Sequence, residues 1–176
     1  TMFANQNMLD AIGEGVPTTF DELLSTGKKL KSGDVAGVAM RSKADGTAGS
    51  WPGGGFVFSN GGVIIQDGKC MLDSPEAIEA IHYYGTILKE AGPLGVGNYH
   101  WYECLNDYMQ EVCGIGMDSS NFATDIENPE KSNAAGHTTY GAMVSGPGKQ
   151  AKPNMWHWMA GINSKSQQKA AAFLFL

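Results

Sequence analysis

The alternation of apolar and polar residues along the chain predicts several amphipathic helices. The clearest signal spans residues 73–92, where Ser74 is a candidate N-cap, Pro75 suits the first helical position and Gly92 suits the end. The apolar positions that recur there at helical spacing are Ile78, Ile81, Tyr84 and Leu88. We expect this stripe to face the core.

Three further segments show helical spacing. Residues 18–32 open with Thr18 or Thr19 as a candidate N-cap and stop at Gly33. A second helix is expected over 101–112, with a stripe placed mainly in the core that comprises Trp101, Leu105, Tyr108 and Val112. The last is expected over 164–176, where Ser164 and Gln167 form a candidate capping box.

Short apolar runs between these helices predict strands. We expect strands over 35–40, 114–118, 139–144 and 155–162. The Asp67-Gly68 pair predicts a hairpin turn between the flanking apolar runs. Strands alternating with helices predict the α/β class, with a mixed sheet flanked by helices, and ligands in such sheets bind in loops beyond the strand ends.

Two tryptophans, Trp156 and Trp158, stand two residues apart in the strand expected over 155–162. Side chains at positions i and i+2 of a strand emerge on the same face, so both rings would point the same way. The pattern leaves two interpretations open: the rings are buried in a core, or they form a wall against which a ligand binds.

A glycine-rich stretch over 46–62 carries a third tryptophan, Trp51. Glycine allows flexibility and close backbone approach, so the stretch is expected to be a ligand-facing loop or a short helix. Because glycines supply few packing partners, ligand contact is favoured over burial for Trp51.

Composition narrows the possible functions. The chain has 176 residues, of which 42% are hydrophobic and 17% charged, values typical of a soluble globular protein or one lobe of a larger one. No apolar run approaches the roughly 20 residues that a bilayer requires. The net charge of -6 and the lack of a broad basic cluster argue against nucleic acid as a partner.

The usual signatures of metal sites and of catalysis are missing from the sequence. Cys70, Cys104 and Cys113 lack metal-ligand spacing; Cys104 and Cys113 are expected to pack as small apolar residues, with a disulfide between them as the alternative. His100 and Glu103 are three residues apart without a second histidine, so a solvated helix face is favoured over a metal site. No phosphate-binding loop or nucleophile elbow occurs, and no metal or cofactor is expected.

Five stretches of the chain, taken in order, resemble the extracellular solute-binding proteins (family 1) of ABC importers, the family that includes maltose-binding protein, and within it the members for sugars and sugar alcohols. The stretches are VPTTFDELLSTGKKLKSGDVAGVAMR, FVFSNGG, LDSPEAIEAIHYYGTILKEAGPLGVGNYHW, MDSSNFATDIENPEKSN and MWHWMAGINSKSQQKAAAFLF. The resemblance implies a type II fold of two α/β lobes that close on a ligand. Residues 1–176 would be a single α/β lobe, most of the second, without the first lobe and the C-terminal return. The uncapped apolar run at 173–176 agrees with such a fragment.

The resemblance also implies which residues bind the ligand. Trp51 would stack on a sugar, Arg41 would point into the cleft, and Asp118, Ser119 and Asn121 would supply polar contacts after the strand at 114–118. Trp156 and Trp158 form the W-x-W run typical of the relatives that bind polyol-like ligands. Maltose binders have a tryptophan where this chain has Asn121 and Phe122, so maltodextrin specificity is not implied.

Other roles remain open for two of these residues. Asp118 would otherwise cap the helix that begins near Asn121, and Arg41 would otherwise pair with a surface carboxylate.

These observations predict a non-enzymatic sugar or polyol binder in the periplasm or at the cell surface, which delivers its ligand to an ABC permease in the membrane. Two alternatives stay open. One is a carbohydrate-active enzyme in which Asp118 and Glu103 act as paired carboxylates. The other is a ligand-sensing lobe without a transport partner.

Overall fold

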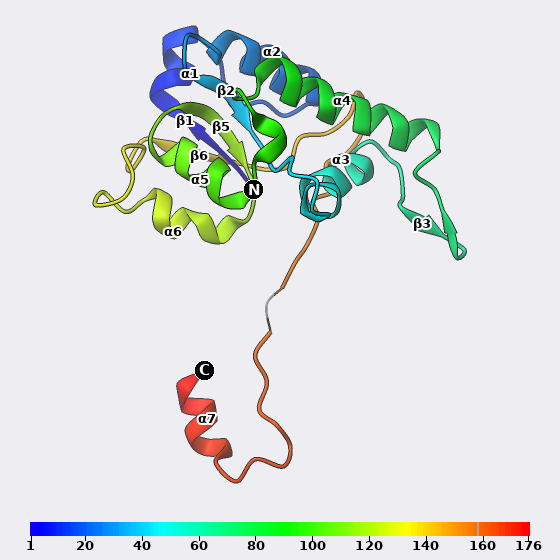
Figure 1. Ribbon diagram of the computed structural model, residues 1–176, viewed down its shortest axis with the longest axis vertical. Coiled ribbons are helices and arrows are strands. Elements are labelled where there is room, and N and C mark those ends of the chain that lie inside the picture. Colours follow the sequence, from blue (N-terminus) through cyan, green and yellow to red (C-terminus); the bar gives the residue numbers. More distant parts are fainter. Residues whose placement is uncertain (158) are drawn as a thin grey trace.

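The computed structural model describes residues 1–157 and 159–176, apart from the side chains of residues 49 and 50. Its centre is a four-stranded mixed sheet in the order β2-β5-β1-β6 (Figure 1). These strands are β1 (Met2–Asn5), β2 (Ala36–Ala39), β5 (Cys113–Met117) and β6 (Thr138–Gly141). β2 and β5 run parallel, whereas β1 is antiparallel to both of its neighbours. The predicted α/β class with a mixed sheet is confirmed.

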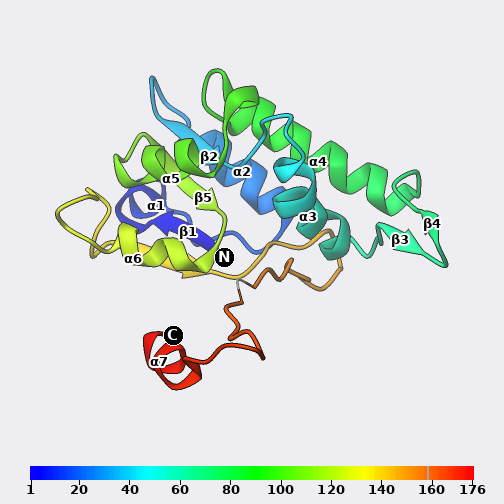
Figure 2. The same ribbon diagram turned by 60° about the horizontal axis from the view of Figure 1, so that its bottom comes forward.

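The chain forms seven α-helices in the part that the structure describes, and all but the last of them surround the sheet (Figure 1). They are α1 (Gln6–Ile12), α2 (Phe20–Leu30), α3 (Gly54–Ser59), α4 (Pro75–Ala91), α5 (Trp101–Met109), α6 (Ala123–Ile126) and α7 (Lys169–Phe175). A π-helical turn at Gly49–Gly53 leads directly into α3. The hairpin predicted at Asp67-Gly68 is β3 (Ile65–Gln66) and β4 (Lys69–Cys70), which projects beyond the start of α4 (Figures 1 and 2).

The two faces of the sheet carry separate cores, and β1 contributes to both. Met2 and Ala4 belong to the larger core, which includes buried side chains from α2 and α4. Phe3, between them, packs on the other face against Tyr108 of α5, with ring centroids 4.7 Å apart. Successive side chains of a strand point to opposite faces, so β1 contributes to both cores. The sheet therefore lies between the helix pairs α2/α4 and α5/α6.

The predicted helix starts follow from their capping residues. Thr19 accepts a hydrogen bond from the Glu22 backbone, and the Glu22 side chain accepts one from the Thr19 backbone, which completes a capping box at α2. Ser74 accepts from Ala77 at the start of α4, with Pro75 in the first turn as expected.

The stripe predicted for α4 is partly wrong. Ile78 and Ile81 are 56% and 48% exposed. The buried positions are the small alanines and the C-terminal half of the helix, namely Ala77, Ala80, Ile87, Leu88 and Ala91. The helix lies close to its neighbours, and this favours alanine over isoleucine on the buried face.

The helix expected over 101–112 forms as α5 but ends at Met109, and the expectations for its stripe have different outcomes. Leu105 and Tyr108 are buried as predicted, but Trp101 and Val112 are 40% and 39% exposed, so their placement in the core was wrong. Trp101 occupies the first position of α5, at the edge of the packed face, where its ring has solvent on one side.

The C-terminal expectations are largely wrong. In the described part of 155–162, residues 155–157 and 159–162, no strand forms, and the chain is extended without a partner strand. The final helix α7 begins at Lys169 with Gln168 as N-cap, so Ser164 and Gln167 do not form the expected capping box. In both ribbon views α7 stands apart from the sheet at the end of this segment (Figures 1 and 2).

Candidate functional site

Two parallel strands end at the same edge of the sheet and place a charged residue there. Arg41 follows β2 and Asp118 follows β5 directly. The Arg41 guanidinium donates from Nε to Asp118 Oδ2 at 2.6 Å and from Nη2 to Asp118 Oδ1 at 2.7 Å. Bidentate hydrogen bonds between charged groups such as these are stronger and more specific in geometry than bonds between neutral groups.

The ion pair is nearly excluded from water. The Asp118 side chain is 0% exposed and the Arg41 side chain 11%. Asp118 Oδ1 also accepts the Ser119 backbone N–H at 2.7 Å. Both carboxylate oxygens are therefore engaged within the protein, whereas Arg41 Nη1 donates to no acceptor in the described part of the chain. Arg41 thus pairs with a buried carboxylate and not with the surface carboxylate considered as its alternative partner. The main partner of Asp118 is Arg41, which the alternative of a helix cap did not include.

Trp51 borders the pair from the π-helical turn before α3. The Arg41 guanidinium carbon lies 5.2 Å from the centre of the Trp51 ring, which is within the range of a cation–π contact. Trp51 is partly buried, and its backbone carbonyl accepts a hydrogen bond from Asn154 Nδ2 at 2.7 Å. The glycine-rich stretch thus forms short helices, the second of the two structures expected for it.

The second aromatic wall comes from the extended C-terminal segment. The rings of Trp51 and Trp156 have centroids 5.2 Å apart and planes inclined at 60°. Trp156 is 59% exposed, so it belongs to no core. Trp158 lies outside the described residues.

A small hollow of about 50 Å³ opens between these elements. Its lining includes Trp51, Asp118 and Asn154, together with Thr1, Pro52, Gly55, Met117, Met143 and Pro153. Pockets that enclose a small molecule usually measure about 300–1,000 Å³. In this conformation the hollow is thus too small to enclose a small molecule.

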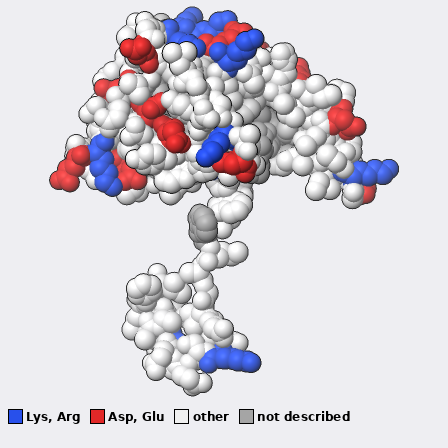
Figure 3. Space-filling model, in the orientation of Figure 1, with Lys and Arg blue, Asp and Glu red and all other residues white. Residues whose placement is uncertain are grey.

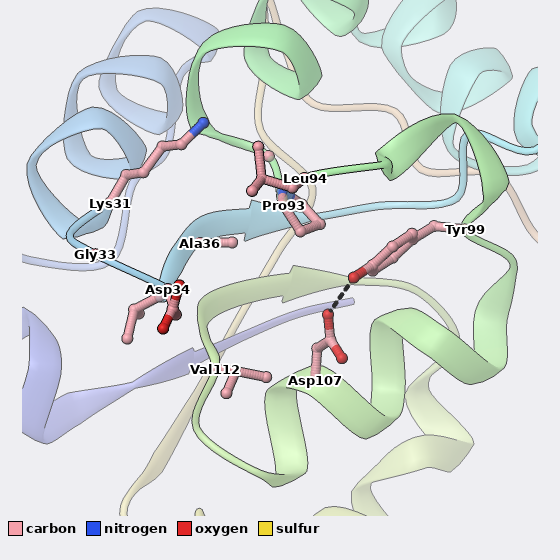
Figure 4. Close-up of a pocket in the computed structure, with 11 residues that line it drawn as sticks. Lys31, Gly33, Asp34, Ala36, Pro93, Leu94, Tyr99, Asp107 and Val112 are labelled. Carbon is pink, nitrogen blue, oxygen red and sulfur yellow. Dashed lines mark hydrogen bonds between the residues drawn. The ribbon is translucent and has the colours of Figure 1, made fainter.

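A larger hollow of about 310 Å³ lies at the opposite edge of the sheet, where β2 begins (Figure 4). Lys31, Asp34 and Tyr99 are among its lining residues, and the Tyr99 hydroxyl donates to Asp107 at 2.7 Å. We place the candidate site at the Arg41–Asp118 edge instead. Parallel α/β strands bind ligands beyond their carboxyl ends, and Arg41 Nη1 there has no acceptor among the residues that the structure describes.

Tyr84 of α4 was expected only as part of an apolar stripe, but it is a neighbour of the candidate site. Its hydroxyl donates to the backbone carbonyl of Arg41. Its ring lies edge-on to Phe56 of α3, with centroids 5.2 Å apart. Burial raises the pKa of the Tyr84 hydroxyl, which remains a protonated donor. Helical spacing indicated an apolar stripe at this position and gave no sign of the hydroxyl's partner.

The other expected polar residues are placed less centrally. Ser119 is partly buried beside Asp118, whereas Asn121 is exposed in the 3₁₀ turn Ser120–Phe122. Phe122 is buried in the α5/α6 core, so it does not stand in for the tryptophan of maltose binders. The site therefore brings together four expected residues, Arg41, Trp51, Asp118 and Trp156, with Ser119 adjacent.

The expected alternatives for catalysis and metal binding can be placed as well. Glu103 accepts the His100 backbone N–H at 2.9 Å as the cap of α5, and hydrogen bonds from the backbone lower its pKa. Cys104 and Cys113 are free and buried, and burial raises the pKa of both thiols. Within residues 1–157 and 159–176, no three metal-ligating side chains come together. None of the helices there has the length and apolar composition of a membrane span.

Comparison with known proteins gives the family. The family described as bacterial extracellular solute-binding protein matches residues 1–176, the whole chain. The chain belongs to this family. The protein therefore acts outside the cytoplasm, in the periplasm or at the cell surface.

Several similar proteins are named for, or were solved with, a sugar or sugar alcohol. A solute-binding protein of an ABC transporter from Agrobacterium radiobacter, solved with ribitol, is 26% identical with a TM-score of 0.84, over 99% of this chain and 45% of that one. The Erythritol/L-threitol-binding protein of Mycolicibacterium smegmatis is 25% identical over 105 residues, 60% of this chain and 22% of the relative. A Thermotoga lettingae solute-binding protein, solved with alpha-D-tagatose, shares the fold with a TM-score of 0.76 at 23% identity, over 99% of this chain and 45% of that one.

The chain thus spans less than half of the length of each of these relatives.

Acidic and basic side chains are scattered over the face seen in Figure 3, without the broad basic surface that a polyanion would need.

Proposed function

We propose that this solute-binding protein binds a neutral sugar alcohol or sugar against Trp51 and the Arg41–Asp118 pair, and delivers it to an ABC permease in the membrane. The observation that carries the proposal is the buried ion pair beside an exposed aromatic wall, at the carboxyl ends of β2 and β5. The 26% identity to the ribitol-bound relative, over 99% of this chain, supports the same ligand class.

The chemistry of the site suits a polyhydroxylated ligand. Indole rings cover the apolar C–H faces of a sugar or polyol, and Trp51 and Trp156 are inclined to each other as two walls. Arg41 Nη1 offers N–H donors that a hydroxyl oxygen accepts. A hydrogen bond from a charged donor contributes about 1.5–3 kcal/mol.

The charge of the site favours a neutral ligand. Arg41 and Asp118 neutralise each other, and both carboxylate oxygens of Asp118 are occupied. An anionic ligand would find only the residual donor of Arg41, while a cationic one would have no free carboxylate oxygen on Asp118. In this proposal Asp118 orients the guanidinium and does not contact the ligand as an acceptor.

We propose that residues 1–176 form one lobe of a two-lobed protein. The span of 45% of the ribitol-bound relative leaves room for a second lobe of similar size. The hollow of about 50 Å³ is too small to enclose a polyol, so the opposing wall would come from that lobe. Ligand that contacts both lobes would favour the closed form, which docks on the permease.

Two geometric features weigh against the enzymatic alternative. Asp118 is held in an ion pair with Arg41 at 2.6 Å, and Glu103 caps α5 with a lowered pKa. A general acid at neutral pH needs a raised pKa, whereas that of Glu103 is lowered, and both oxygens of Asp118 are already engaged in hydrogen bonds within the protein.

Isothermal titration calorimetry of the full-length protein tests the proposal. We expect binding heat with at least one ligand from a panel of ribitol, erythritol, D-mannitol and D-tagatose. An Arg41→Ala variant that remains folded should lose most of that heat. No heat with any member of a wider panel of neutral sugars and polyols would contradict the proposal.

A further inference from the structure

Tyr84 connects the two elements that carry the candidate site. Its hydroxyl donates to the carbonyl of Arg41 just beyond β2. Its ring packs edge-on against Phe56, a fully buried residue of α3, which is the helix that continues from the turn bearing Trp51. Tyr84 therefore contacts both the segment that carries Arg41 and α3, the helix that follows the turn with Trp51.

Other hydrogen bonds hold the chain just after Arg41, including one from the Ser42 hydroxyl to the Val96 carbonyl. The backbone N–H groups of Ser42 and Lys43 donate to the Tyr99 carbonyl, each at 2.9 Å, and hold the residues after Arg41. In the residues that the structure describes, the Arg41 carbonyl itself accepts from Tyr84. Arg41 lies beyond the end of β2 and is not held by strand pairing. The hydrogen bond from Tyr84 therefore fixes the backbone of Arg41 and, with it, the position of the side chain.

We infer that Tyr84 is a positioning residue for the solute site: it holds Arg41 so that the guanidinium keeps its two-pronged contact with Asp118 and its place beside Trp51. The inference rests on the proposed function for its effect on the ligand, but not for its effect on Arg41. Neither Tyr84 nor Arg41 lines the hollow of about 50 Å³, whereas Asp118 and Trp51 do, so Tyr84 acts through the contacts that Arg41 makes with these two residues.

Tyr83, the preceding residue on α4, is a matched control. Its hydroxyl donates to Asp21 at 2.9 Å in an exposed hydrogen bond, and its ring packs against Phe20 with centroids 5.3 Å apart. Tyr83→Phe thus removes the same atom from the same helix without touching the segments that carry Arg41 and Trp51.

The first measurement needs no ligand. In full-length protein labelled with ¹⁵N-arginine, the Arg41 Nε–H signal is assigned by its disappearance in Arg41→Lys. We expect this proton, which is bonded to Asp118, to exchange with solvent about tenfold faster in Tyr84→Phe and at an unchanged rate in Tyr83→Phe. Unchanged exchange in Tyr84→Phe would overturn the inference.

The second measurement is a titration with ribitol. Tyr84→Phe, checked as folded by its thermal transition, should weaken binding about fivefold to tenfold, and Tyr83→Phe should leave it unchanged. Equal affinities in both variants would also overturn the inference. If the parent protein binds no polyol, the proposed function fails, while the exchange of the Arg41 Nε–H still decides whether Tyr84 positions Arg41.

Discussion

Arg41 and Asp118 are joined by hydrogen bonds of 2.6 and 2.7 Å although 77 residues separate them along the chain. The parallel pairing of β2 and β5, with Val38 opposite Ile115, brings the ends of both strands to one edge and makes the contact possible. The contact then fixes the only arginine of the sequence beside Trp51.

Breaking this pair should destabilise the fold strongly. Asp118→Asn leaves the Arg41 charge buried without its partner, and we expect a loss of about 3–5 kcal/mol in the free energy of unfolding, measured with urea. Asp125→Asn is the control, because Asp125 pairs with Lys131 at 2.7 Å on the open surface. Its effect should be within experimental error. A loss as small for Asp118→Asn as for the control would show that the pair is not buried in solution.

The close approach of α2 to the sheet depends on Gly37. A Cβ added there would lie 1.8 Å from the Gly27 carbonyl oxygen, a backbone atom that cannot move aside without shifting α2. Gly37→Ala should therefore lower the free energy of unfolding by about 1–3 kcal/mol.

Gly85 lies in the exposed part of α4, and replacing it by alanine should stabilise the protein, unlike the same change at Gly37. A Cβ there meets nothing within 4 Å, so Gly85→Ala should stabilise the protein by up to about 1 kcal/mol. Thermal unfolding of both variants measures the two effects. Equal changes of the same sign would contradict the packing described for α2 against β2.

Trp51 should contribute to ligand affinity without a large part in stability. Trp51→Ala removes an aromatic wall and the contact with Arg41, and we expect ribitol binding to weaken by at least about tenfold in calorimetry. Trp101→Ala is the control, since Trp101 is 40% exposed on α5 and does not line the hollow. Ribitol affinity that falls equally in both variants would argue against a site at Trp51.

Glu111 links stability to pH. It accepts hydrogen bonds from Asn5 Nδ2 at 2.8 Å and from the His137 ring at 2.7 Å, and the bond from His137 is the main cause that lowers its pKa below the ordinary 4.5. A carboxyl with a depressed folded-state pKa stabilises the protein above pH 4.5, and the contribution is lost as pH falls through the folded value.

Unfolding of the parent and of Glu111→Gln, followed by urea between about pH 6 and pH 3, measures this link. The parent should be the more stable protein near pH 6, and its advantage should shrink as the solution is acidified. An advantage that stays constant or grows toward pH 3 would contradict the assignment.

The sequence was sufficient where local chemistry decides the structure. Thr19, Ser74 and the Asp67-Gly68 turn carry their own signals, and the helices and the hairpin formed where these residues predicted. It was insufficient for β1 and α1, which no expected element covered. β1 is four residues long and becomes a central strand because β5 and β6 pair with its two edges.

The same distinction applies to the site. Trp51 was expected from the glycine-rich stretch and from the resemblance, Arg41 and Asp118 from the resemblance, and the three do lie together. The pairing of Trp156 with Trp51 could not follow from a strand pattern, because the segment at 155–157 is extended without strand partners. Tyr84 was missed since helical spacing reveals which face a residue occupies but not what its hydroxyl meets across the fold.

The most direct test of the account is a crystal structure of the full-length protein grown with ribitol. We predict density for a polyol against the Trp51 ring, with a hydroxyl oxygen within hydrogen-bonding distance of Arg41 Nη1 and the Arg41–Asp118 pair intact. Density that instead fills the hollow lined by Tyr99 and Lys31, or that leaves Trp51 and Arg41 without ligand contact, would contradict it.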